Sequence, residues 1–289
     1  MSEHLKYPIG KRVLLFLIIL AISSLIGAAI MALCMLAGDM GMKLGQGLSS
    51  IMMFVVPPIV YYRFTRSEDQ LEALGLRSPV EPQWLILIGV VLMFVSLPVT
   101  NQLARWNENT TFFDSFEKLE DFLKMMEETA TAATEKMLNV DTFGGLLLNL
   151  LVIALIPAIG EELTFRGVLQ QGLMRKMNPH VAIVISAAIF SFIHFQFYGF
   201  LPRMFLGLLL GYMFYITDSL WTSILMHFVN NGTVVMVYYL NNKGIISIDA
   251  EHFGEAPNSW MVTISAVVTV LLILWSWWKI DYTKKGNNL

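Results

Sequence analysis

The chain has little charge and almost no cysteine. Only 14% of its 289 residues are Asp, Glu, Lys or Arg, compared with about 25% in an ordinary soluble domain. The net charge of −3 is small, and no basic stripe is present, so nucleic acid is not an expected partner. Because Cys34 is the only cysteine, the sequence excludes a disulfide framework and a cysteine-based zinc site.

Long apolar segments dominate instead, with 56% hydrophobic residues and a mean hydropathy of +0.62. A membrane-spanning helix needs about 20 residues. The segments predict an all-α polytopic membrane bundle of about eight transmembrane helices. They are Val13–Ala37, Leu44–Tyr62, Trp84–Thr100, Phe143–Gly160, Val181–Tyr198, Met204–Thr217, Leu220–Leu240 and Trp260–Trp278. The first is longer than the apolar part of a signal peptide and is expected to be retained. The sixth is long enough only if residues 200–203 join it.

The basic residues predict the orientation of the bundle. With eight spans and the N-terminus inside, the inner segments hold 12 of the 19 Lys and Arg residues. Four of the remaining seven share one long loop with nine acidic residues. This bias follows the positive-inside rule and predicts that both termini are cytoplasmic.

The loop at 101–142 carries an amphipathic pattern. Apolar residues recur at spacings of three to four, and acidic residues occupy much of the other face. The apolar set is Phe112, Phe116, Leu119, Leu123 and Met126, and the acidic set is Glu117, Glu120, Asp121, Glu127 and Glu128. The pattern predicts a helix lying at the outer interface. We therefore divide the chain into three spans with this helix (1–142), a core (143–240), and a loop with the last span (241–289).

A few polar residues fall inside or at the end of apolar segments, where each ionisable group is a candidate functional group. They are Glu161, Glu162, Arg166, His194 and His227, with Asn231 one turn beyond His227.

Helical spacing separates the roles of the two glutamates. Glu162 and Arg166 are four residues apart, share a helix face and are expected to form a neutralising ion pair. Glu161 points about 100° away and lacks that partner. Burial without a cation favours the protonated form of a carboxyl group, so such a group takes up a proton readily, as a general base must.

His227 and Asn231 are also four residues apart, so their donors face one point. Amide hydrolysis needs a base for water and donors for the oxyanion. These requirements fit Glu161 and His194 on one side and His227 and Asn231 on the other. The groups reach similar depths only if the fourth span continues unbroken to about Arg175.

Three segments carry a family resemblance: Glu161-Glu162-Leu-Thr-Phe-Arg166, Phe190-Ser-Phe-Ile-His194 and His227-Phe-Val-Asn-Asn231. They resemble the CPBP family, also called Abi, which comprises the CAAX prenyl proteases and bacteriocin-processing or immunity proteins. The resemblance covers about Phe143 to Leu240.

The resemblance implies an intramembrane endopeptidase. Glu161 and His194 would activate water, His227 and Asn231 would hold the oxyanion, and Glu162 and Arg166 would form the structural pair. It also implies a multi-pass protein of the bacterial plasma membrane, surrounded by membrane lipids, that acts on a peptide or membrane-protein substrate.

Several alternatives stay open. By residue type, Glu161, His194 and His227 are also able to ligate Zn²⁺, although a glutamate-dependent mechanism uses the same residues and no cofactor. The protein is either a peptidase or a non-catalytic immunity or scaffold protein of the same family. A proton-coupled transporter is a third hypothesis, because intramembrane Glu and His also build proton relays.

Overall fold

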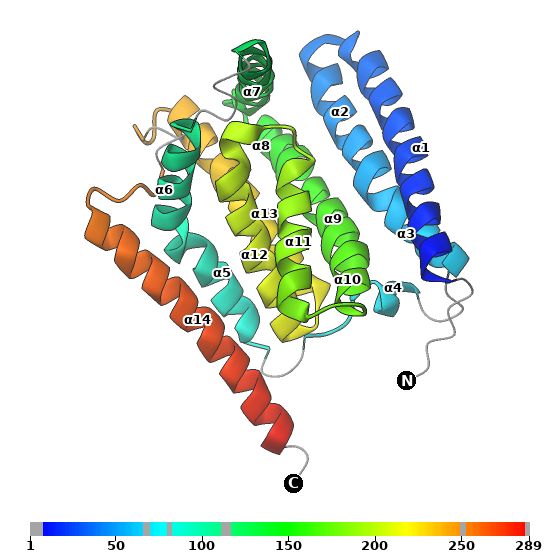
Figure 1. The fold of residues 1–289 in the computed structure, drawn as a ribbon. Coiled ribbons are helices and arrows are strands. Elements are labelled where there is room, and N and C mark those ends of the chain that lie inside the picture. Colours follow the sequence, from blue (N-terminus) through cyan, green and yellow to red (C-terminus); the bar gives the residue numbers. More distant parts are fainter. Residues whose placement is uncertain (1–7, 66–69, 80–82, 111–116, 249–252, 287–289) are drawn as a thin grey trace.

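The computed structural model describes residues 8–65, 70–79, 83–110, 117–248 and 253–286, and every regular element in these ranges is helical (Figure 1). The N-terminal elements are α1 (Ile9–Met35), α2 (Gly38–Ser50), the π-helical stretch η1 (Ile51–Val55), α3 (Val56–Thr65), α4 (Gln70–Ala73), α5 (Leu85–Val95), α6 (Leu97–Glu108) and α7 (Glu117–Leu138). The predicted all-α bundle is confirmed.

A single continuous helix, which we call the motif helix, follows at Phe143–Met174. Its segments are α8 (Phe143–Asn149), η2 (Leu150–Leu155), α9 (Ile156–Glu162), η3 (Leu163–Gln170) and α10 (Gln171–Met174). The remaining elements are α11 (Pro179–Phe192), the short 3-10 turn η4 (Phe197–Gly199), α12 (Phe200–Thr217), α13 (Leu220–Asn242) and α14 (Ser259–Gly286).

Six helices in the described part of the chain are long and apolar enough to cross a membrane. The pair α5 and α6, bent by 44°, makes a seventh if it counts as one span. The sixth apolar segment reaches spanning length because its helix starts at Phe197, so the predicted extension is confirmed. These helices make the chain a multi-pass integral membrane protein. The cytoplasmic position of the termini and the three-part division stay predictions.

The prediction of one long span through Val181–Tyr198 is wrong. The helix α11 ends at Phe192 and has only 14 residues. The backbone N–H of His194 bonds the carbonyl of Ser191, and Phe195 then adopts a left-handed conformation with φ 53°. Hydropathy does not reveal this turn, because Ile193, Phe195 and Phe197 continue the apolar run on both sides of His194.

The motif helix passes Pro157 without a break and runs to Met174, which confirms the predicted continuation to about Arg175. Pro157 lies just after the π-helical stretch η2. The extra residue in a π-helical turn disturbs the usual i to i+4 pairing of carbonyls. In the other two π-helical stretches side chains bond such carbonyls: Thr164 donates to the carbonyl of Phe54 in η1 (2.8 Å), and Tyr62 donates to the carbonyl of Gly167 in η3 (2.9 Å).

Two glycines bring α12 against its neighbours. A Cβ at Gly207 would lie 3.0 Å from the Cβ of Ala187 on α11, and one at Gly211 would lie 2.8 Å from Oε1 of Gln170 on η3. The small-residue spacing from Gly207 to Gly211 therefore marks close helix packing. Through this packing α12 lies beside both α11 and the motif helix.

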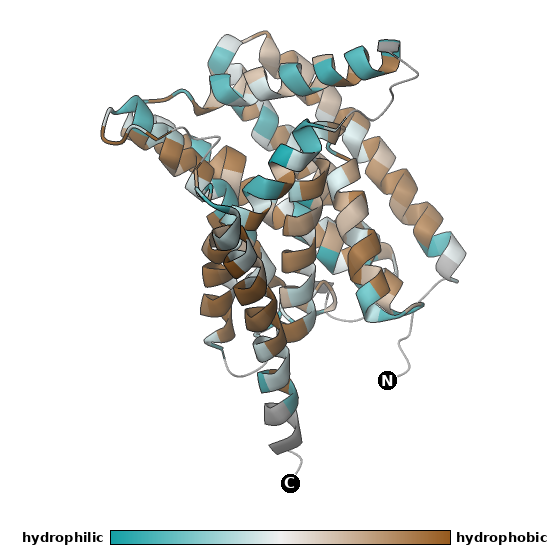
Figure 2. Ribbon diagram, turned by 60° about the vertical axis from the view of Figure 1, so that its left-hand side comes forward, coloured by the Kyte–Doolittle hydropathy of each residue, from teal (hydrophilic) through white to brown (hydrophobic). Residues whose placement is uncertain are grey.

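The amphipathic helix of the long loop is α7, which lies across one end of the bundle (Figure 1). Figure 2 shows hydrophilic residues concentrated at that end and hydrophobic residues along the long helices beneath it. Phe112 and Phe116 lie outside the described residues. The expected outward position of Glu120 is wrong: this side chain is buried and accepts a hydrogen bond from the Tyr198 hydroxyl.

Candidate active site

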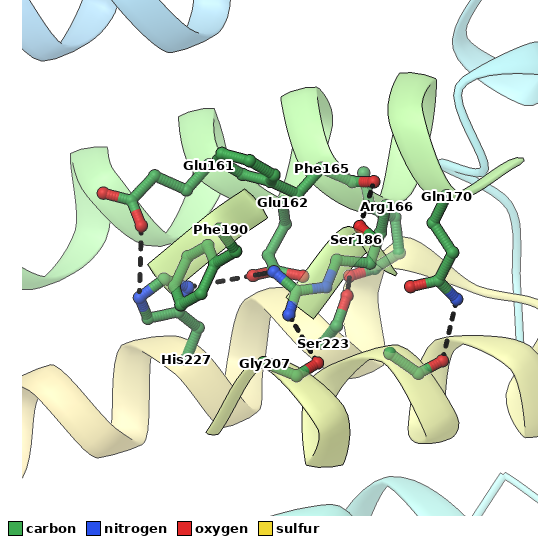
Figure 3. Close-up of polar contacts among 12 residues, drawn as sticks. Glu161, Glu162, Phe165, Arg166, Gln170, Ser186, Phe190, Gly207, Ser223 and His227 are labelled. Carbon is green, nitrogen blue, oxygen red and sulfur yellow. Dashed lines mark hydrogen bonds and ion pairs between the residues drawn. The ribbon is translucent and has the colours of Figure 1, made fainter. Parts of the chain in front are cut away.

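The motif helix and α13 together build a buried polar cluster (Figure 3). Glu161, Glu162 and Arg166 project from the motif helix toward His227 on α13. Two further residues of the predicted site lie nearby in the chain. His194 lies on the turn after α11, and Asn231 lies on α13, one helical turn after His227. The cluster therefore draws on three separate stretches of the chain.

Glu162 is the centre of the charged network. Its Oε1 accepts hydrogen bonds from Nη1 of Arg166 at 2.7 Å and from Nδ1 of His227 at 2.9 Å. Glu162 is 0% exposed and Arg166 1%. Buried charges are tolerated only when they are paired and hydrogen-bonded, and Glu162 supplies that compensation to Arg166.

Arg166 makes two further contacts. Its Nη2 donates to the carbonyl of Gly207 at 2.8 Å, and its guanidinium carbon lies 4.9 Å from the centre of the Phe190 ring. One turn later, Nε2 of Gln170 donates to the carbonyl of Gly211 at 2.9 Å. Two donors four residues apart therefore meet two glycine carbonyls four residues apart, and this fixes the motif helix along α12.

Sequence reasoning missed Gln170 and the link between Glu162 and His227. For Gln170 a signal existed, because it repeats the position of Arg166 one turn on and faces the second of two spaced glycines. The contact from Glu162 to His227 joins residues 65 apart, and no local spacing predicts it.

The contact to Glu162 sets the tautomer of His227. A carboxylate only accepts, so Nδ1 carries the proton and donates it. The other nitrogen, Nε2, lies 3.8 Å from Oε2 of Glu161. Nε2 is thus a donor when the ring is an imidazolium, and an imidazolium would balance the charges of Glu161, Glu162 and Arg166. His227 is held between the two glutamates.

Glu161 is bound more loosely than its neighbour. Glu161 as a whole residue is 8% exposed. The distance between its Oε2 and Nε2 of His227 is longer than a hydrogen bond. The two adjacent glutamates therefore differ as the spacing predicts: one belongs to a tight ion pair and the other does not.

His194 and His227 pack on the same aromatic ring, with centroids 5.3 and 5.9 Å from that of Phe190. Nδ1 of His194 lies 2.8 Å from the carbonyl of Phe190. A carbonyl only accepts, so Nδ1 donates and Nε2 is left with a lone pair that can accept a proton from water. The ring is half-buried, which leaves it accessible from the site.

Asn231 uses its amide group on neighbouring backbone and side chain. Its Nδ2 lies 3.4 Å from the carbonyl of Ile153 in η2, and its Oδ1 accepts from Asn230 at 3.0 Å. The first of these contacts is long and weak. Asn231 thus lies beside the segment of the motif helix that precedes Glu161, and its role in holding an oxyanion stays a prediction.

The turn that carries His194 is held from the far side by other helices. On α7, Glu127 accepts from the backbone N–H of Tyr198 at 3.2 Å. On α6, Asn107 donates to the carbonyl of Phe197 at 2.8 Å and accepts from the N–H of Leu201 at 2.6 Å. These contacts compensate for the left-handed conformation of Phe195, which is costly for an aromatic residue.

The donor set does not match a metal site. Within the described ranges, no three His, Cys, Asp or Glu side chains are gathered closely enough to hold a metal ion. Glu161 and His227 approach each other, but Nδ1 of His227 is already bound by Glu162. The geometry of Glu161, His194 and His227 therefore does not fit a three-ligand zinc centre.

Comparison with known proteins gives one match. Residues 143–233 match the family model described as "Rce1-like: Type II CAAX prenyl endopeptidase Rce1-like". Neither the curated proteins nor the solved structures contain a match. The matched region starts with the motif helix and ends on α13 just after Asn231, so it contains all six residues of the predicted site. Together the motifs, their convergence in the fold and the family match over residues 143–233 support membership of the CPBP family of CAAX proteases.

Proposed function

We propose that the protein is an intramembrane endopeptidase that hydrolyses a peptide bond at or near the membrane. The observation that carries the proposal is the division of labour between two adjacent glutamates. Glu162 is committed to Arg166 and His227, while Glu161 is loosely held and faces the same histidine. A base must be free to take a proton, and Glu161 is the carboxylate with that freedom.

The proposed reaction is a water attack on the scissile carbonyl. Glu161 takes a proton from the water as its oxygen bonds to the carbonyl carbon, and Nε2 of His194 accepts a hydrogen bond from the same water. The carbonyl oxygen becomes an oxyanion. Glu161 then gives the proton to the leaving nitrogen as the C–N bond breaks, so the products are a carboxylic acid and an amine.

His227 and Asn231 are proposed to stabilise the oxyanion. Glu162 holds Nδ1 of His227, so an imidazolium at this position would present its Nε2–H toward the side where Glu161 lies. Preorganised donors of this kind contribute strongly in a dry site. The weak contact of Asn231 to Ile153 leaves its amide able to turn toward a substrate.

The substrate is proposed to be a peptide or a membrane protein. The test is a comparison of protein N- and C-termini in membranes from cells expressing wild type or Glu161→Ala. New termini that depend on Glu161 support the proposal and name the substrate. The matched control is Glu128→Ala, which removes an exposed carboxylate on α7. Identical termini with wild type and Glu161→Ala would contradict peptidase activity.

The alternative is a non-catalytic immunity or membrane scaffold protein of the same family. The buried Glu162–Arg166–His227 network favours this alternative, because such a network stabilises helix packing even in a protein that catalyses no reaction. The discriminating variant is Glu161→Gln, which keeps shape and removes the base. An unchanged cellular phenotype with this variant would establish the scaffold role.

A bacterial plasma membrane is the proposed location.

Metal dependence is tested separately, by elemental analysis of purified wild type and of the double variant His194→Ala/His227→Ala. Stoichiometric zinc in the first and its loss in the second would establish a metal centre and require the residues to regroup around it.

A further inference from the structure

A large pocket lies beside the candidate site, along the motif helix. Its volume is about 730 Å³, and it is bounded by α1, by η1 and α3, by η3 and α10, and by the end of α11. That volume is typical of ligand pockets. Glu161, His194 and His227 are not among its lining residues, so a molecule lying there would be next to the reacting groups and not on them.

The wall of the pocket is apolar along its length. Phe16, Leu17 and Leu20 of α1 face Phe165 and Leu169 of the motif helix across it. On α1 the pocket extends from Arg12 to Ser24, which are 12 residues apart and therefore separated by about 18 Å. On the motif helix the lining residues run from Thr164 in η3 to Leu173 in α10. The pocket is an elongated slot that suits a hydrocarbon chain.

Charge is confined to one end of this slot and has one sign. Its charged lining residues are Arg12, Arg175 and Lys176, all of them cationic. Arg12 lies in the first turn of α1, and the other two follow α10 directly. Figure 1 shows the start of α1 and the end of α10 toward the same end of the bundle. An anionic group is the complement of this end.

The outer side of α1 faces the surroundings of the bundle. Leu14, Leu25 and Leu33 are 58%, 73% and 68% exposed, as expected for a helix in contact with lipid. In the fold, α1 packs on α2, η1 and α3, and it faces α10 across the pocket. An apolar slot at the edge of a membrane protein is always next to the acyl chains of the bilayer. A lipid molecule therefore reaches it directly from the membrane.

We propose that this pocket binds one anionic phospholipid, with an acyl chain along the apolar wall and the phosphate at Arg12 and Lys176. Lys and Arg near a membrane surface attract anionic lipid with about 1 kcal/mol each. The end with the three cations is also the end that the positive-inside rule assigns to the cytoplasmic leaflet, where anionic lipids are enriched.

A bound chain would also touch the turn of the candidate site. Ile193 and Phe195, the two neighbours of His194, line the pocket. The lipid would therefore support the His194 turn and fill the space between α1 and the motif helix. This binding is independent of catalysis, and it is measured without turnover.

The test is native mass spectrometry of the full chain released from vesicles of equal parts phosphatidylglycerol and phosphatidylcholine. We expect one phosphatidylglycerol retained in preference to phosphatidylcholine. The double variant Arg12→Gln/Lys176→Gln should lose this preference by about 30-fold, since two cations are removed. The control Lys11→Gln/Arg63→Gln removes the same charge from exposed residues outside the pocket and should behave as wild type.

A second variant blocks the apolar part. Gly172 lines the pocket and has open space at its Cβ, so Gly172→Phe should fill the slot and reduce retained phosphatidylglycerol without a backbone clash. Gly144→Phe, on the same helix and also with open space, is its control. Equal retention of both lipids by the wild type, or unchanged retention in both pocket variants, would overturn the proposal. Displacement of the lipid by an apolar peptide would overturn it too and assign the pocket to the substrate.

Discussion

The two sides of the motif helix at the Glu161–Glu162 pair are held in opposite ways. On the Glu162 side, short charge-assisted bonds join Arg166 and His227 to one carboxylate oxygen, and exposure is close to zero. On the Glu161 side, the nearest of these groups is 3.8 Å away. One of the two adjacent glutamates thus fixes Arg166 and His227, while the other, which is the proposed base, is held loosely beside the same histidine.

The largest effect is expected when Glu161, the proposed base, is replaced. Glu161→Gln should lower cleavage by about 10²–10⁴-fold, the range for a general base, while thermal unfolding in detergent changes little. The measurement is cleavage of a substrate found by terminal proteomics, beside an unfolding curve. Normal cleavage by Glu161→Gln would contradict distinct roles for the two glutamates. A loss of stability as large as that of a Glu162 variant would contradict them too.

Breaking the Glu162 side should damage the fold as well. Glu162→Ala leaves Arg166 buried without its partner, which costs about 3–5 kcal/mol, measured by unfolding in detergent. The double variant Glu162→Leu/Arg166→Met removes both charges and should recover part of this loss. If Glu162→Ala kept full stability, the buried pair would not be a structural element.

The next prediction concerns α12, which contacts the Glu162 side because the carbonyl of Gly207 accepts a hydrogen bond from Arg166. The substitution Gly207→Ala places a methyl group 3.0 Å from the Cβ of Ala187 and should destabilise by about 1–3 kcal/mol. Gly232→Ala on α13 is the control, because its nearest contact would be 3.7 Å. Equal unfolding temperatures for the two variants would show that the approach of α12 is not tight.

The smallest effect concerns the outer support of the His194 turn. Burial raises the pKa of Glu127 above its ordinary value of 4.5, and Arg203 opposes this more weakly. The folded state therefore holds this proton more tightly than the unfolded state. The associated stability is greatest below about pH 4.5 and is lost as pH rises through the folded pKa.

The variant Glu127→Gln should flatten this dependence. Its unfolding temperature relative to wild type should rise with pH between about pH 4 and 8 by roughly 1–2 °C. Glu128→Gln, an exposed neighbour on α7, should leave the wild-type slope unchanged. A slope that stays the same in Glu127→Gln would assign the pH dependence to another group.

Much of the fold and part of the site followed from sequence. Apolar length predicts spans because a bilayer forces the chain to satisfy its backbone within helices, and the four-residue spacing predicts that Glu162 and Arg166 meet. The turn at His194 could not be predicted, since Phe192 and Phe195 continue the apolar run. The contact of Glu162 with His227 and the inward position of Glu120 arise from tertiary packing, which local periodicity does not encode.

The π-helical stretch η3 has a consequence for how this chain tolerates change in length. A π-helical turn holds one residue more than an α-helical turn, so deleting one residue between Leu163 and Gln170 would convert the stretch to regular α-helix. Residues before and after the deletion would keep their relative direction, because only the extra residue of the wide turn is removed. Gln170 would still face Gly211 on α12. A deletion in a regular α-helical part of the motif helix would instead rotate all later residues by about 100°, so this segment should tolerate the loss of one residue better than the segments beside it.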